Sequence, residues 1–206
     1  MSKVAKEAFS EIIESSLHGF VSQCWEWDNF PNFGQLVTVQ SGKRTLFGLV
    51  HQIRTGSMDP IRSPFPYQKT EKELLEEQPQ IFEFLKTTFS CLTIGYLENE
   101  KIFYLMSPQP PKIHAFVHHT PADLSKRFFA NLGYLHLLFA NSNQITCLDE
   151  LLLALLKNQF ALGIMKTEKI NEFVDSFSLL TGNDYRRLKL FLQRADGFYD
   201  HDKIKK

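Results

Sequence analysis

QPQIFEFLKTTFSCLTIGYLENEKIFYLMSPQPPKIHAFV, residues 78–117, is the stretch that decides the fold. Residues 89–97 and 101–106 are rich in the β-branched and aromatic side chains that strands favour. Between them lies the polar segment 98–100, in which Asn99 tolerates the positive φ of a tight turn. The pattern therefore predicts a hairpin. Both strands are almost continuously apolar, so we expect one face to line a barrel interior and the other to lie under helices.

Prolines limit the second strand of this hairpin. Pro108, Pro110 and Pro111 cannot donate hydrogen bonds to a neighbouring strand, so we expect that strand to end near Ser107. The apolar segment 113–117 then predicts a closing strand.

The chain before the hairpin supplies the other strands of the expected barrel. These candidate strands are 11–15, 20–27, 35–39 and 45–53. Gly19 lies in the turn between the first two, and Gly48 within the last predicts a bulge or a tight bend. A single helix over residues 4–17 is the alternative for the first strand. We favour the hairpin, because the helix would leave the next strands without a partner.

A helical insertion is expected between residues 57 and 87, inside the barrel sequence. Thr70 and Glu73 have the spacing of a capping box, which predicts a helix beginning at Thr70. Pro79 should break this helix or restart it. We expect the restarted helix to have Gln78 as its cap and to bury Ile81, Phe82 and Leu85.

After residue 118 the apolar spacing becomes helical and predicts four helices. Their expected ranges are 120–140, 146–163, 167–182 and 183–197. The apolar stripes at 124–139 and 148–156 are wide for helices that cover only each other, so we expect them to pack on the barrel. The predicted fold is α+β. A leader (1–10) precedes a six- or seven-stranded β-barrel (11–118), and a helical region of about four helices follows (119–206).

Composition restricts the functional classes. The 206 residues are 43% hydrophobic and 22% charged, which is typical of soluble domains. Lysine plus arginine and aspartate plus glutamate each total 23, and this neutral balance argues against a dedicated nucleic-acid binder. Three widely spaced cysteines fit a reducing compartment. No apolar run has the length of a membrane-spanning helix or a signal peptide, so we expect a cytoplasmic protein without membrane contact.

Five stretches resemble the HAS-barrel family, the small β-barrel shared by HerA-type helicase-ATPases and the N-terminal domains of ATP-synthase catalytic subunits. They are EIIESSLHGFVSQC (11–24), FGQLV (33–37), FGLVHQIRTGSMDPIR (47–62), QPQIFEFLKTTF (78–89) and PQPPKIHAFV (108–117). The last three resemble stand-alone bacterial members that carry a helical tail in place of a motor domain. The resemblance implies a barrel that acts in assembly or partner docking.

The ATPase activity of the motor relatives is not implied. The only Gly-Lys pair is Gly42-Lys43, and a P-loop would need glycine at Val37 and serine or threonine at Arg44. We therefore expect this chain neither to bind nor to hydrolyse ATP.

Two groups of side chains contain reactive residue types, and neither has the pattern of a known site. His114, His118 and His119 could offer an i, i+4 metal pair, but no metalloprotease glutamate and no cysteine accompany them. Ser57, Asp59 and His51 lack a G-x-S-x-G elbow, and Asp59-Pro60 is more typical of a turn. We predict no enzyme activity, no metal site and no cofactor.

The proline-rich segment 56–70 predicts a surface for a protein partner or for a second copy of the chain. Met58, Phe65 and Tyr67 would be apolar anchors, and Arg62 and Lys69 a charged rim. The alternative is that this segment packs on its own barrel.

A second hypothesis is a nucleic-acid-processing accessory protein whose barrel contacts DNA or RNA. Its candidate cations are Lys43, Arg44, Arg54 and Arg62, which lie near aromatic residues that could stack on bases. The alternative is that the aromatic residues belong to the barrel core and that the cations are solvated at its rim.

Overall fold

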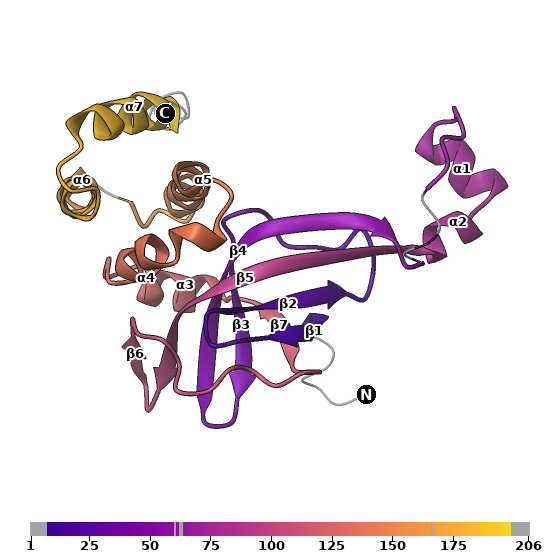
Figure 1. The fold of residues 1–206 in the computed structure, drawn as a ribbon, viewed down its shortest axis with the longest axis horizontal. Coiled ribbons are helices and arrows are strands. Elements are labelled where there is room, and N and C mark those ends of the chain that lie inside the picture. The colour runs from indigo at the N-terminus through magenta and orange to yellow at the C-terminus, as the bar shows by residue number, and fades with distance from the viewer. Residues whose placement is uncertain (1–7, 60, 62–63, 166, 199–206) are drawn as a thin grey trace.

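A computed structural model describes residues 8–59, 61, 64–165 and 167–198, and its fold is α+β with a closed barrel (Figure 1). The strands are β1 (Ala8–Ser15), β2 (Gly19–Cys24), β3 (Leu36–Ser41), β4 (Arg44–Ser57), β5 (Leu85–Glu98), β6 (Lys101–Phe103) and β7 (Phe116–His119). They pair antiparallel in the order β2-β1-β7-β3-β4-β5-β6, and a further pairing of β2 with β5 closes the first six into a barrel. β6 is an extra strand on β5.

The N-terminal hairpin is confirmed, and the helix over residues 4–17 is wrong for the described part of that range. β1 already begins at Ala8, so the barrel starts before the predicted boundary at residue 11. β1 pairs on both sides, with β2 and with β7, which explains why the chain is extended there.

The last two strands, β6 and β7, differ from their predicted ranges. β6 ends at Phe103, because the Tyr104 side chain turns away and its hydroxyl donates to the Phe128 carbonyl at 2.5 Å. The closing strand runs over 116–119 and not 113–117, because His114 has a φ of 66°, which a strand does not accommodate.

The barrel wall is buried on both faces along β3, β4 and β5, as the apolar hairpin predicted for β5. One face lines the interior, and the other packs under the helices. The interior cluster comprises Phe9, Ile12, Phe20, Cys24, Val37, Val39, Leu46, Val50, Phe89, Cys91, Tyr96 and Val117. Strands β3, β4 and β5 turn Leu36, Phe47, Leu49, Leu92 and Ile94 outward to the helical layer. The predicted irregularity at Gly48 is confirmed by a register shift between Phe47 and Gly48.

The helical layer contains one helix more than predicted. It comprises α3 (Ala122–Phe128), α4 (Tyr134–Ala140), α5 (Leu148–Ala161), α6 (Thr167–Leu180) and α7 (Tyr185–Ala195), with short 3₁₀ helices η2 (Ser142–Gln144) and η3 (Asp196–Phe198). The predicted helix 120–140 is two helices, because the Asn131 Oδ1 accepts a bond from the Gly133 N–H at 2.7 Å and turns the chain. Phe128, Tyr134 and Leu135 share one core with the barrel wall, so the predicted packing of the helices on the barrel is confirmed.

The insertion between β4 and β5 projects away from the barrel, and we call residues 58–84 the arm (Figure 1). Its helices are α1 (Glu71–Glu77) and α2 (Gln80–Glu83). The capping box at Thr70 is confirmed. The predicted insertion 57–87 was too long, because β4 and β5 stay paired as far as Ser57 and Leu85.

The cap and the burial predicted for the second arm helix are wrong. α2 is preceded by Pro79 as its N-cap position, and not by Gln78. Ile81, Phe82 and Leu85 are half-buried, because nothing in the described chain forms a second layer over the arm.

Candidate functional site

The arm carries large apolar side chains that are exposed to solvent. They are Met58, Ile61, Phe65, Tyr67, Leu75 and Phe84. Neither α1 nor α2 buries any residue. The two rings predicted as anchors, Phe65 and Tyr67, contact each other edge to face with centroids 5.6 Å apart, and Phe65 is 71% exposed. These rings therefore belong to neither hydrophobic core of the described chain.

The base of the arm is braced against the barrel. Beyond the β4–β5 ladder, the Met58 N–H donates to the Phe84 carbonyl at 2.7 Å. The Phe82 ring stacks on Trp27 with centroids 5.5 Å apart. The Thr87 hydroxyl also donates to the Trp27 carbonyl. These contacts fix the base of the arm on the barrel, so that the apolar side chains of the arm project in a defined direction.

The charged rim of the arm is acidic. Residues 70–84 carry five glutamates and one lysine. Glu77 pairs with Lys69, and hydrogen bonds from the Thr70 backbone and side chain lower the pKa of Glu73. The remaining three glutamates, Glu71, Glu76 and Glu83, form no ion pair with the described residues.

The structure describes one of the two cations predicted for this rim. Lys69 is used in its pair with Glu77, and Arg62 lies outside the described residues. A partner that docks on the arm meets mostly negative charge, which the sequence interpretation did not anticipate.

The cations of the nucleic-acid hypothesis lie at two ends of one strand. Lys43 and Arg44 are at the β3–β4 turn, where the Arg44 guanidinium pairs with Glu98 at 3.0 Å. Arg54 is ten residues further along β4, roughly 33 Å away at the usual rise of a strand. Arg62 lies outside the described residues. The described members do not form one basic patch, and nucleic-acid binding stays a prediction.

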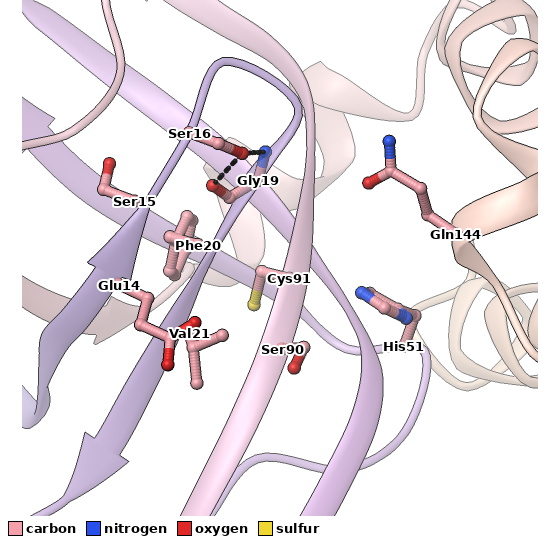
Figure 2. A pocket seen from close by; sticks show the side chains of 10 residues that line it. All are labelled: Glu14, Ser15, Ser16, Gly19, Phe20, Val21, His51, Ser90, Cys91 and Gln144. Atoms are coloured by element: carbon pink, nitrogen blue, oxygen red, sulfur yellow. Dashed lines mark hydrogen bonds between the residues drawn. The ribbon is translucent and has the colours of Figure 1, made fainter.

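A pocket of about 260 Å³ opens beside the seam where β2 meets β5 (Figure 2). The β1–β2 hairpin contributes Glu14, Ser16 and Gly19, and His51 and Gln144 reach in from β4 and η2. His51 is the bulged residue of β4, since the register shifts between Val50 and Gln52. Bulges often re-aim side chains beside functional sites.

The groups around this pocket do not make a reactive pair. Cys91 is fully buried in the barrel core, and this burial raises the pKa of its thiol well above the usual range. Burial lowers the pKa of His51, which keeps its imidazole neutral at neutral pH. The Ser16 hydroxyl is engaged with Gly19 at 3.0 Å. This pocket can offer hydrogen bonds to a small polar group, but among its lining residues we find no activated nucleophile.

Ser57, Asp59 and His51 do not form a catalytic triad, because His51 is far from the other two. The Ser57 hydroxyl accepts from the Asp59 N–H at 3.1 Å, and Asp59 in turn accepts from the Ile61 N–H at 3.0 Å. His51 is six residues earlier on the same strand, about 20 Å away along β4. The predicted turn at Asp59 accounts for the first two residues.

The three histidines do not converge either. His114 pairs with Glu11 at 2.5 Å, and His119 stacks on the Phe9 ring with centroids 4.1 Å apart. Where the structure describes the chain, it contains no group of three metal-ligating side chains placed to hold an ion. Among the same residues, no helix combines the length and the apolar character needed to cross a membrane.

Comparison with models of known protein families and with curated proteins finds no match for this chain. A closed six-stranded barrel occurs in unrelated proteins, so the fold alone does not assign the HAS-barrel family.

Proposed function

We propose that this protein is a non-catalytic docking module, in which the barrel and its helices form a platform and the arm binds a protein partner. The observation that carries the proposal is the exposure of six large apolar side chains on a braced projection. Contiguous apolar patches on the surface of a protein often mark interfaces, and the Phe65 and Tyr67 rings contact each other on this surface. The few residues that dominate binding energy in protein interfaces are enriched in Trp, Tyr and Arg, and Tyr67 is of this type.

The character of the arm defines its partner. Its apolar side chains call for an apolar groove, and its excess of glutamates favours cationic side chains at the edge of that groove. Pro64 and Pro66 restrict the segment that carries Phe65 and Tyr67, which reduces the entropy lost on binding. We therefore propose a protein partner with a basic-edged apolar surface.

The HAS-barrel resemblance supports the same role. Its five stretches contain all of β2 and parts of β1, β3, β4, β5 and β7, and the family uses this barrel for assembly and docking. Membership in that family, as a stand-alone form without an ATPase domain, is part of the proposal, as is a cytoplasmic location.

The test is a pull-down from the native cell, with wild-type protein compared with Phe65→Ala/Tyr67→Ala. We expect the double variant to lose the main partner and to melt at nearly the wild-type temperature, because both rings lie outside the cores. The matched control is Leu105→Ala/Met106→Ala, which removes two exposed apolar side chains away from the arm. The control should retain the partner.

Two outcomes would contradict the proposal. If the double variant retains every partner that the wild type retains, the arm is not the docking surface. If its melting temperature falls sharply, the two rings stabilise the fold and do not form a free binding surface.

A further inference from the structure

A pocket of about 280 Å³ lies between the barrel and the helical layer. Its walls come from the segment before β3, which contributes Gly34 and Gln35, from Ser125 in α3 and from Asn158 near the end of α5. None of the described residues that line it carries a charged side chain. Ligand sites occur preferentially where packed units meet, at domain interfaces and between helices. We call this space the interlayer pocket.

The walls of the interlayer pocket are fixed by contacts within the chain. The Gly34 N–H donates to the Val50 carbonyl at 2.8 Å, and the Gly34 carbonyl accepts from the Asn158 side-chain amide at 3.0 Å. Gly34 has a φ of 74°, and a Cβ there would come within 2.9 Å of the Ala154 Cβ on α5. The segment before β3 is therefore clamped between β4 and α5. Binding would need little rearrangement of these walls, which reduces its entropic cost.

Two polar side chains of the interlayer pocket have hydrogen-bonding capacity that the described chain does not use. Ser125 is only 5% exposed, yet solvent reaches its hydroxyl, which forms no hydrogen bond with the described residues. Asn158 donates its amide N–H to Gly34, which leaves its Oδ1 as an acceptor without a partner in the same part of the chain. Polar side chains as buried as Ser125 are mostly hydrogen-bonded. The two side chains therefore offer one hydroxyl and one carbonyl acceptor to a molecule in the pocket.

The lining also restricts the chemistry of that molecule. An ion would lose its hydration in the interlayer pocket without meeting an opposite charge, which favours an uncharged ligand. Leu36, Phe129 and Leu162 supply apolar wall. Phe129 is only 3% exposed, so its ring presents no open face on which a nucleobase could stack. Hydroxyl groups on a carbon frame match both the polar and the apolar part of this lining.

We infer that the interlayer pocket binds a small uncharged ligand with several hydroxyl groups, of the class of the monosaccharides and cyclic polyols. One ligand hydroxyl donates to the Asn158 Oδ1, and another exchanges a hydrogen bond with the Ser125 hydroxyl. The pocket lies beside α3 and α5, far from the arm helices α1 and α2 (Figure 1). The inference therefore goes beyond the docking function and does not depend on it.

NMR of the full chain tests this site directly. The isotope-labelled protein is titrated with glucose, galactose, mannose and myo-inositol. We expect at least one of them to shift the side-chain amide of Asn158 and the backbone amides of 122–125 in a saturable way, while the amides of 71–77 in the arm stay in place. The inference is wrong if none of the four produces a saturable shift in the pocket signals. It is also wrong if glucosamine or glucuronate, which carry a charge, binds more tightly than all four.

Two variants test the groups that hold the ligand. Ser125→Ala and Asn158→Leu each remove one of the two hydrogen-bonding groups. Each should weaken binding about threefold to tenfold, which is the usual contribution of one hydrogen bond. Circular dichroism verifies that each variant is folded. A folded Ser125→Ala that binds as tightly as the wild type would overturn the inference.

The matched control is Thr120→Val, which has nearly the same shape. Thr120 lines the same pocket, but its hydroxyl, which also has no partner, is sealed from solvent, so a ligand does not reach it. Thr120→Val should therefore bind as the wild type does. Equal losses of affinity in Thr120→Val and Ser125→Ala would contradict the assignment of the Ser125 hydroxyl to the ligand.

Phe65→Ala/Tyr67→Ala separates this site from the proposed docking surface. The double variant should bind the ligand as tightly as the wild type, because neither ring lines the interlayer pocket. If the wild type binds none of the four compounds but needs the two rings to retain a partner, only the site inferred here is wrong. If it binds one of them and the rings are not needed for any partner, only the docking function is wrong.

Discussion

The barrel–helix interface and the arm contain the same aromatic residue types, which are buried in the interface and exposed in the arm. In the interface, Phe47 and Phe128 are fully buried with ring centroids 4.4 Å apart. In the arm, Phe65 and Tyr67 contact each other and remain exposed. Aromatic content therefore does not distinguish core from surface in this chain. The difference is the number of layers. β3, β4 and β5 are covered on both faces, whereas no described residue forms a layer over the arm.

This difference decides where the hydrophobic free energy is released. Burying a large apolar side chain contributes roughly 1.5–3 kcal/mol. Phe47 and Phe128 contribute it when the chain folds, whereas Phe65 and Phe84 stay largely exposed and contribute little of it to folding. Substitutions in the two regions should therefore change different measurements, stability in one and binding in the other.

The largest effect should come from a charge in the shared core. Leu135 is fully buried between α4 and the barrel wall. Leu135→Asp would bury a carboxylate that has no partner, so we expect a loss of about 3–5 kcal/mol in the free energy of unfolding. Chemical denaturation measures this loss, and hydrogen exchange should show lower protection in β5 as well as in α4. The control is Leu179→Asp on the exposed side of α6, which should change little. Unchanged protection of β5 would contradict a shared core.

The next effect compares two glycines. Gly19 lies where β2 closes on β5, and a Cβ there would come within 2.0 Å of the Cys91 carbonyl oxygen. A Cβ at Gly56, near the base of the arm, would meet nothing within 4 Å. Gly19→Ala should cost at least about 2 kcal/mol, because the seam of the barrel must open. Gly56→Ala should be neutral or slightly stabilising. Equal melting temperatures for the two variants would show that the seam is not tightly closed.

The local patterns of the sequence were sufficient for most of the fold. Alternating and continuous apolar runs predicted the strands, and the Thr70–Glu73 spacing predicted the capping box that the structure contains. One error lies where a tertiary contact decides, since the end of β6 depends on the Tyr104 hydroxyl reaching the Phe128 carbonyl. The break before α4 is a local feature, because the Asn131 side chain accepts a bond from the Gly133 N–H two residues later. Asn and Gly at that spacing are typical of a turn, so this break was open to prediction from the sequence.

The candidate site was predictable only in part. The proline-bounded segment with Phe65 and Tyr67 indicated an interface, and the structure leaves both rings exposed. The acidic rim was missed, because Lys69 counts as a free cation in sequence and the structure pairs it with Glu77. The pairing of two α7 cations could not be predicted from local sequence either, because the partners of Arg187 and Arg194 are Asp149 and Glu150 of α5.

A smaller effect should be confined to the arm. Thr70 accepts a bond from the Glu73 N–H, and the Glu73 carboxylate accepts one from the Thr70 N–H at 2.7 Å. Thr70→Ala removes the cap, which typically costs a helix about 1 kcal/mol. Because α1 buries no residue, we expect faster hydrogen exchange over 71–77 with no change in global stability. Thr70→Ser keeps the cap and is the control. A lower global stability in Thr70→Ala alone would mean that the arm is part of the cooperative core.

The smallest effect is the pH dependence of stability, which arises in the barrel. Burial lowers the pKa of His51, at the bulge of β4, below its value in the unfolded chain. The unfolded state therefore binds the proton more readily, and stability falls as the pH drops through about 6.5, the ordinary value for histidine. Urea midpoints measured between pH 7.5 and pH 5.5, roughly one unit on either side of that value, should decrease accordingly. His119, whose pKa is lowered in the same direction, adds a weaker contribution because its ring is largely exposed.

His51→Gln should flatten most of this pH dependence, because glutamine does not titrate. Thr70→Ala, which lies in the arm, should leave the slope as it is in the wild type. If His51→Gln keeps the full slope, the proton is bound elsewhere on unfolding, and the bulge does not hold its histidine out of water. If Thr70→Ala changes the slope, the arm and the barrel unfold as one unit, and the contrast between a two-layered core and an uncovered projection would have to be abandoned.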